Sequence, residues 1–160
     1  MDSLFNLPAH PLLVHIPVMG VPLAAFGAIV IALRPRWRRA YGPLVVAMAA
    51  IGAFGALLAA GSGESLQESQ SIRDIGDHGS YGEFARNVSF LLLGLVFVLV
   101  ALDRWRSHPR LQRVPVWALT AVAGLTIVGS LGAAATMVLA GHSGAKQVWR
   151  DGRSEQVRPR

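Results

Sequence analysis

Four apolar stretches, each about as long as a lipid bilayer is thick, constrain this chain more than any other feature. A bilayer core of about 30 Å requires roughly 20 apolar residues per helix. The sequence meets this requirement over residues 12–33, 43–60, 84–102 and 116–140. Lipid cannot hydrogen-bond to the backbone, so each stretch must be helical. We therefore predict an all-α fold: a single integral membrane domain over residues 1–160, built as a four-transmembrane-helix bundle from two helical hairpins.

Composition supports this class and excludes others. Hydrophobic residues make up 52% of the chain and charged residues only 15%, which is too apolar for an ordinary soluble domain. The net charge of +6 comes from short arginine clusters between the apolar stretches, so we expect no nucleic-acid partner. The chain has no cysteine, which excludes disulfides, iron–sulfur clusters and thiol catalysis. Any bound metal must be held mainly by nitrogen and oxygen.

The charges of the connecting segments predict how the bundle lies in the cell membrane. Short loops rich in Lys and Arg stay in the cytoplasm, and eight arginines fall in the segments 34–42 and 103–115. Both loops are therefore predicted to be cytoplasmic, and the acidic link 61–83 to lie outside. The N-terminus and C-terminus of this multi-pass protein then also lie outside. The basic C-terminal tail opposes this orientation, but the eight arginines in two short turns outweigh it.

Small residues repeat at intervals of four on the second and fourth stretches. They let helix backbones approach closely where lipid gives no hydrophobic driving force. These positions are Gly52, Ala56 and Ala60, and Gly132, Thr136 and Ala140. We expect both faces to point into the bundle.

Histidines and carboxylates gather at the predicted outer end of every helix. Six residues contribute: His10, His15, Glu64, His78, Glu83 and His142. Imidazole and carboxylate groups from separate elements are what a transition metal ion requires. The six residues are therefore our candidate metal ligands, for Zn, Cu or Fe. A b-type haem held by His15 and His142 is the other cofactor that the pattern allows, because facing helices of a bundle can each supply an axial histidine.

Each of these residues also has a simpler interpretation. An interfacial histidine often only caps a helix or is solvated, and Glu83 suits the positive end of a helix. His15 is the strongest candidate, because an ionisable residue inside an apolar stretch is costly without a partner. No hydrolase or phosphate-binding motif is present. We therefore assign no catalytic residue and leave open whether the chain is an enzyme.

Several motifs resemble those of a known family. Residues 7–17, which contain HPLLVH, resemble the opening signature of a widespread bacterial family of small four-helix membrane proteins, catalogued as a domain of unknown function. Residues 62–66, His78 with residues 82–83, and the run GHSGAKxVW at 141–149 resemble the later landmarks of its actinobacterial-type branch. The resemblance implies a four-helix membrane architecture and some association with redox or cytochrome-containing proteins. It implies no established activity, and it falls on the same six residues.

Three hypotheses about function follow. The first is a membrane protein that binds a transition metal or b-type haem through histidines at the extracytoplasmic end, with a redox role. The second is a non-catalytic membrane subunit or scaffold with structural histidines, whose small-residue faces dock a membrane protein partner or a second copy. The third is a metal-dependent membrane hydrolase, whose bound metal activates water. All three place the chain in contact with the lipid bilayer.

Overall fold

The computed structural model describes residues 3–4, 7–70, 78–106 and 114–156, and the side chains of 13–63, 79–106 and 114–146. Four long helices account for nearly all of these residues: α1 (Ala9–Leu33), α2 (Pro35–Gln70), α3 (His78–Arg106) and α4 (Val116–Gln156). Before α1, the two-residue strands β1 (Ser3–Leu4) and β2 (Leu7–Pro8) pair antiparallel.

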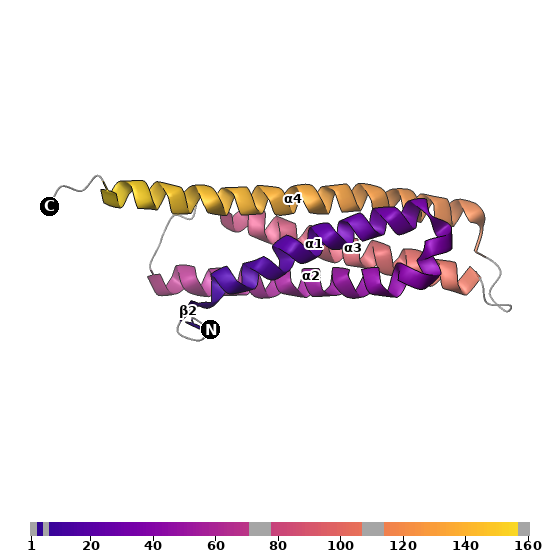
Figure 1. Cartoon of the computed structure of the whole chain (residues 1–160), viewed down its shortest axis with the longest axis horizontal. Helices are drawn as coiled ribbons and strands as arrows, with labels where there is room; N and C mark the ends of the chain where they lie inside the picture. The colour runs from indigo at the N-terminus through magenta and orange to yellow at the C-terminus, as the bar shows by residue number, and fades with distance from the viewer. Residues whose placement is uncertain (1–2, 5–6, 71–77, 107–113, 157–160) are drawn as a thin grey trace.

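The helices form one antiparallel bundle in which consecutive helices are neighbours (Figure 1). α1 packs on α2 and α4, and α3 also packs on α2 and α4, so that α1 and α3 are diagonal partners with little contact. The start of α1 and the end of α4 lie at the same end of the bundle, as an even number of spans requires (Figure 1). The predicted all-α four-helix fold is thus confirmed. Which side of the membrane each end occupies stays a prediction from the charge pattern.

The start of α2 differs from the prediction. Residues 34–42 were expected to form a loop, but only Arg34 is non-helical, and α2 begins at Pro35. Proline is favoured at the first helical position, where its missing N–H is not needed. The amide of Trp37 bonds to the carbonyl of Arg34 at 2.9 Å. The first turns of α2 run across the end of the bundle before the helix turns back beside α1 (Figure 1).

The other helices also extend past their apolar stretches. α3 continues through Asp103 to Arg106, so the first part of the predicted loop 103–115 is helical. α2 reaches Gln70 inside the acidic link, and α4 continues to Gln156. Local helix propensity is enough for these extensions, because a helix that is already nucleated gains one hydrogen bond for each residue added.

The core follows a repeat with alternating intervals of four and three residues on each helix. The positions that follow this repeat are buried: on α2 they are Arg38, Gly42, Val45, Ala49, Gly52, Ala56 and Ala59, and on α4 they are Leu119, Ala123, Thr126, Ser130, Ala133 and Met137. This average spacing of about 3.5 residues is the pattern of helices that wind around one another with a left-handed twist. Because most of these side chains are small, the helix backbones lie close together.

The predicted small-residue face of α2 points inward, as expected. Gly52 and Ala56 are buried, and Ala60 is half-buried. A Cβ atom on Gly52 would lie 2.8 Å from a methyl carbon of Val21 and 3.3 Å from the carbonyl carbon of Gly20. The α1–α2 interface therefore consists of backbone against backbone at this height. On α4, Thr136 is buried, while Gly132 and Ala140 are half-buried.

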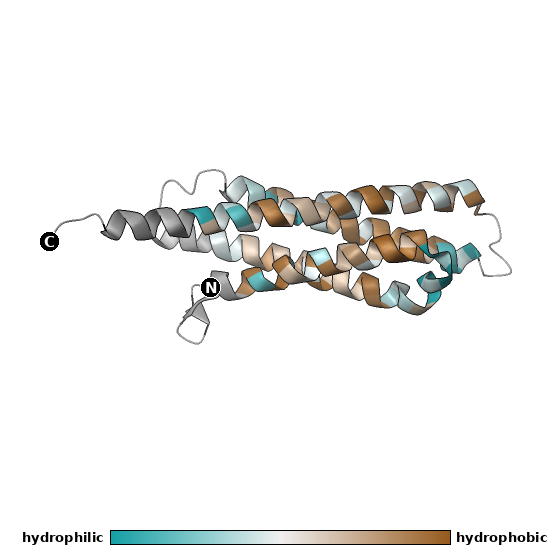
Figure 2. Ribbon diagram, turned by 45° about the horizontal axis from the view of Figure 1, so that its top comes forward, coloured by the Kyte–Doolittle hydropathy of each residue, from teal (hydrophilic) through white to brown (hydrophobic). Residues whose placement is uncertain are grey.

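The outer surface of the bundle matches a lipid environment. All four helices contain a segment long and apolar enough to span a membrane. Large apolar side chains are exposed around the bundle, including Phe26, Phe54, Leu125 and Val128. The apolar band occupies the middle of the bundle, and the polar residues lie toward its two ends (Figure 2). The chain is thus a multi-pass membrane protein whose helices contact the bilayer.

Candidate functional site

The predicted histidine site lies at the end of the bundle that carries both chain termini. His10 is in the first turns of α1, Glu64 is in α2, and His78 begins α3, but the side chains of these three residues lie outside the described part. The side chains of His15, Glu83 and His142 are described, and all three are exposed. His15 is therefore on the outer surface of α1 and not in the bundle interior.

Contacts between neighbouring helices fix which residues lie at the same height. Three such contacts are Gly20 against Gly52, Phe54 against Phe90 with ring centroids 5.6 Å apart, and Gly129 against Leu95. The helices are antiparallel, so equal numbers of residues can be counted outward from each contact. This register gives His10, Ser62, Gly82 and His142 one common height, on four different helices. His15 lies five residues deeper along α1, which corresponds to about 7.5 Å.

The remaining candidates lie close to that common height. Glu83 is one residue away from it on α3, whereas Glu64 and His78 are farther out by two and four residues. The sequence prediction that these residues meet at one end of the bundle thus agrees with the helix register. Within the side chains that the structure describes, however, no three His, Asp or Glu groups are close enough to hold a metal ion. The predicted ligand set remains a prediction, because three of its members are outside that part.

Two serine hydroxyl groups near this end donate hydrogen bonds to their own helices. Ser62 donates to the carbonyl of Ala59 at 2.9 Å, and Ser143 donates to the carbonyl of Ala140 at 2.8 Å. Such bonds to a preceding turn satisfy a hydroxyl in an apolar environment. In the described part of the bundle, every buried side-chain nitrogen and oxygen atom has a partner.

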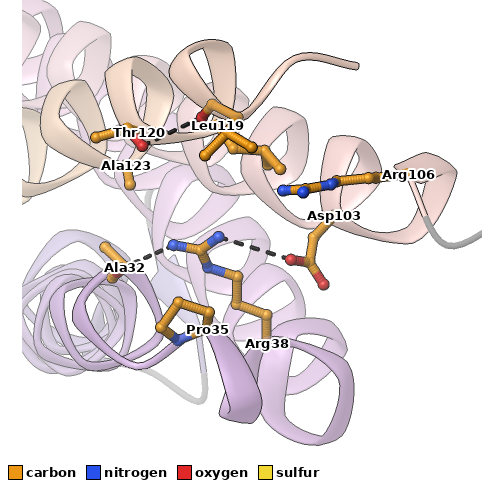
Figure 3. A pocket seen from close by; sticks show the side chains of 9 residues that line it. Ala32, Pro35, Arg38, Asp103, Arg106, Leu119, Thr120 and Ala123 are labelled. Atoms are coloured by element: carbon orange, nitrogen blue, oxygen red, sulfur yellow. Dashed lines mark hydrogen bonds and ion pairs between the residues drawn. The ribbon is translucent and has the colours of Figure 1, made fainter. Parts of the chain in front are cut away.

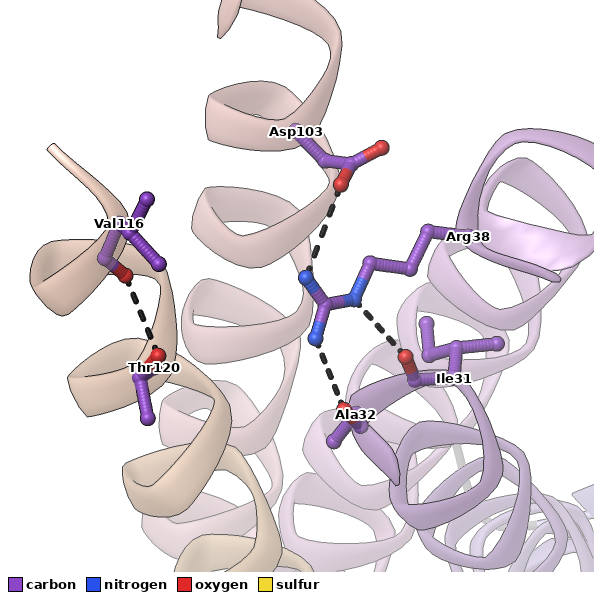
Figure 4. Close-up of polar contacts among 6 residues, drawn as sticks. All are labelled: Ile31, Ala32, Arg38, Asp103, Val116 and Thr120. Atoms are coloured by element: carbon purple, nitrogen blue, oxygen red, sulfur yellow. Dashed lines mark hydrogen bonds and ion pairs between the residues drawn. The ribbon is translucent and has the colours of Figure 1, made fainter. Parts of the chain in front are cut away.

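A second polar cluster occupies the opposite end, which we call the arginine-rich end: Arg34, Arg36, Arg38, Arg39, Arg104 and Arg106. Its centre is Arg38, which is only 6% exposed. The Arg38 side chain donates from Nε to the carbonyl of Ile31 at 2.9 Å and from Nη2 to the carbonyl of Ala32 at 2.8 Å. Its Nη1 lies 3.6 Å from a carboxylate oxygen of Asp103 (Figure 4).

This arrangement joins three helix ends. The last carbonyls of α1 have no partner within their own helix, and a cation near them also interacts favourably with the negative end of the helix dipole. Arg38 supplies both the donors and the charge, while Asp103 near the end of α3 offsets the charge of the buried guanidinium. The side chain of Asp103 is 18% exposed. The cluster therefore fixes how the bundle closes at this end.

A pocket of about 270 Å³ lies beside the Arg38–Asp103 pair. Its lining comes from all four helices: Ala32, Pro35, Arg38, Asp103, Arg106, Val116, Leu119, Thr120 and Ala123. The side chains of Arg38 and Arg106 lie on either side of Asp103, and Thr120 is on the facing helix (Figure 3). The pocket thus has a polar edge with two guanidinium groups and one carboxylate, and an apolar wall formed mainly by α4.

Sequence reasoning missed this cluster, although a signal for it was present. The intervals of four and three on α2 continue backward from Ala49 through Val45 and Gly42 to Arg38. If this repeat is extended into the predicted loop 34–42, Arg38 is the arginine that falls on the buried face of the helix. Asp103 stands out as the only acidic residue beside the eight arginines of segments 34–42 and 103–115, and an acid in that place has an obvious partner.

Comparisons with known proteins identify a family but no function. The family model described as "Predicted membrane protein (DUF2231)" matches residues 6–156, nearly the whole chain. No curated protein and no solved structure matches the chain. The family description agrees with the membrane architecture given above.

Proposed function

The chain belongs to this DUF2231 family, and we propose that it binds a transition metal ion through histidines at the end of the bundle that carries both termini. One observation supports this most. The helix register gives His10 and His142 the same height, with Glu83 one residue away, on three different helices. Ligands from several elements are needed to surround an ion. His15, His78 and Glu64 are the candidates to complete the site.

The type of ligand defines the class of metal. Imidazole with carboxylate suits zinc, copper or iron, and the absence of cysteine argues against ions that need thiolate. Bound copper or iron would give the protein an electron-transfer role, whereas zinc would not. A metal with an open coordination position could activate water, which is the hydrolase hypothesis.

The geometry favours an ion over b-type haem. A haem inside the bundle needs an apolar space between helices next to its axial histidine. His15 faces outward, and the adjacent Ile16 packs against α2, since a Cβ on Gly55 would lie 2.5 Å from its Cγ2 atom. A haem ligated by His15 and His142 would therefore have to lie on the surface of the bundle. An ion bound near the height of His142 needs no such space.

The scaffold hypothesis finds less support. It used the small-residue faces to dock a partner, but Gly52 and Ala56 are buried inside the chain's own bundle. A partner would have to bind to the large apolar side chains, which the lipid also contacts.

Metal titration of the detergent-purified, metal-stripped protein tests the proposal. Isothermal titration with Zn²⁺ and Cu²⁺ should give about one ion per chain. His10→Ala and His142→Ala should each weaken binding by about 10- to 100-fold or more, because the loss of even a residue that supports a ligand has that effect. His108→Ala is the matched control, since His108 lies in the sequence between α3 and α4 and is not one of the six candidate ligands. Unchanged affinity in both site variants would overturn the assignment.

A further inference from the structure

The pocket at the arginine-rich end lies at the opposite end of the bundle from the proposed metal site. We propose that it binds the phosphate headgroup of an anionic phospholipid from the adjoining leaflet. The argument rests on the charge of the pocket, its donors, its walls and its position.

The charge of the pocket favours an anion. Two guanidinium groups, of Arg38 and Arg106, and one carboxylate, of Asp103, line the pocket. The other arginines at this end add to the positive field. Basic pockets between transmembrane helices are recognised binding places for anionic lipid headgroups.

Hydrogen-bond donors are also available. A guanidinium has five N–H donors, and Arg38 donates two hydrogen bonds, to the carbonyls of Ile31 and Ala32, beside its ion pair with Asp103. The burial of Arg38 and its carbonyl bonds hold the group in a fixed orientation. Arg106 is exposed, and its side chain extends along the edge of the pocket beside Asp103 (Figure 3). A phosphate bound in the pocket would receive charge-assisted bonds from both arginines.

The walls and the volume match a lipid better than a soluble anion. Val116, Leu119 and Ala123 form an apolar wall on the first turns of α4, and Val116 and Trp117 are exposed on the same turns. An acyl chain can therefore leave the pocket along α4 toward the apolar band. A volume of about 270 Å³ is just below the range of about 300–1,000 Å³ that is typical for whole small-molecule ligands, and it suits a headgroup alone.

Native mass spectrometry of the full chain in detergent tests the proposal. The probes are phosphatidylglycerol and phosphatidylcholine with the same acyl chains. We expect one phosphatidylglycerol to be retained, with an affinity at least about tenfold above that for phosphatidylcholine. Arg106→Gln should weaken phosphatidylglycerol binding by about tenfold or more. Arg104→Gln, which removes the same charge from an exposed position that does not line the pocket, should weaken it by less than about threefold.

A second pair of variants tests the pocket without changing charge. Thr120→Phe places a ring in the pocket and should abolish selective retention. Ala121→Phe adds the same ring at the next residue, which is exposed and does not line the pocket, and should leave retention unchanged. Equal losses in Arg104→Gln and Arg106→Gln, or equal losses in the two Phe variants, would overturn the proposal. Displacement of the lipid by millimolar inorganic phosphate or glycerol 1-phosphate would also overturn it, by showing that the site takes a free phosphate.

Discussion

Replacing Arg38 with Met should destabilise the bundle far more than replacing any exposed arginine near it. The substitution keeps an unbranched apolar stem and removes the guanidinium. It removes the donors to the carbonyls of Ile31 and Ala32 and the ion pair with Asp103. The α1 and α3 ends are then no longer joined through α2.

The size of the effect follows from these contacts. A hydrogen bond to a charged group contributes about 1.5–3 kcal/mol, and removing one member of a buried ion pair costs about 3–5 kcal/mol. The pair with Asp103 is long at 3.6 Å, and the Asp103 side chain keeps 18% of its exposure. We therefore take the lower end and expect a loss of about 3 kcal/mol. Asp103→Asn should cost less than Arg38→Met, about 1–2 kcal/mol, because Arg38 loses the ion pair but keeps both carbonyl bonds.

The assay is reversible unfolding in mixed micelles with increasing dodecyl sulfate, followed by circular dichroism. Arg36→Met is the matched control, since Arg36 is exposed on the same turns of α2 and should change stability by less than about 0.5 kcal/mol. If Arg38→Met and Arg36→Met unfold at the same dodecyl sulfate fraction, Arg38 does not join the helix ends as described.

Three further outcomes are expected. Gly52→Ala should destabilise the protein by about 1–3 kcal/mol in the same assay, because its Cβ would meet the α1 backbone. Gly94→Ala is the control and should be neutral or slightly stabilising, because nothing lies within 4 Å of a Cβ at that position. Equal effects of the two substitutions would contradict the close α1–α2 contact. Ser130→Ala should cost less than about 1 kcal/mol, because its hydroxyl only donates to its own helix backbone at 2.6 Å; a larger loss would show that the hydroxyl bonds across helices. The chain has no cysteine, so the single variants Gly79→Cys and Arg36→Cys can be labelled in intact cells with a membrane-impermeant maleimide. Only Gly79→Cys should react. Labelling of Arg36→Cys alone would show that the predicted membrane orientation is reversed.

The sequence was sufficient to predict the four spans and the inward face of α2. Span length follows from bilayer thickness, and inward-facing small residues follow from the need for close contact between helices. Each of these patterns can be recognised in the sequence of a single helix. Gly52 and Ala56 could therefore be assigned without knowledge of their neighbours.

The role of Arg38 could not be seen so directly. The four arginines within residues 34–39 look equivalent as charges, and the positive-inside rule treats them alike. What distinguishes Arg38 is its partners, which lie on two other helices. The expectation of a loop over residues 34–42 concealed the helical repeat that places Arg38 on the bundle face.

The candidate metal site was predicted from topology alone, and the helix register agrees with that grouping. The faces of individual residues were harder to predict. His15 was expected to be the best-placed ligand because it lies inside an apolar stretch, yet its side chain is exposed. An exposed imidazole near the helix end can reach the headgroup region, so its cost in the apolar stretch is smaller than the sequence argument assumed.

The number of metal atoms per chain tests the central claim most directly. Elemental mass spectrometry of the protein, purified in detergent without chelators after expression with added zinc, copper and iron, gives this number and identifies the element. We expect about one zinc, copper or iron atom per chain, reduced to background in the His10→Ala/His142→Ala double variant. A metal content at background in the wild-type chain, or equal content in the double variant, would contradict the claim.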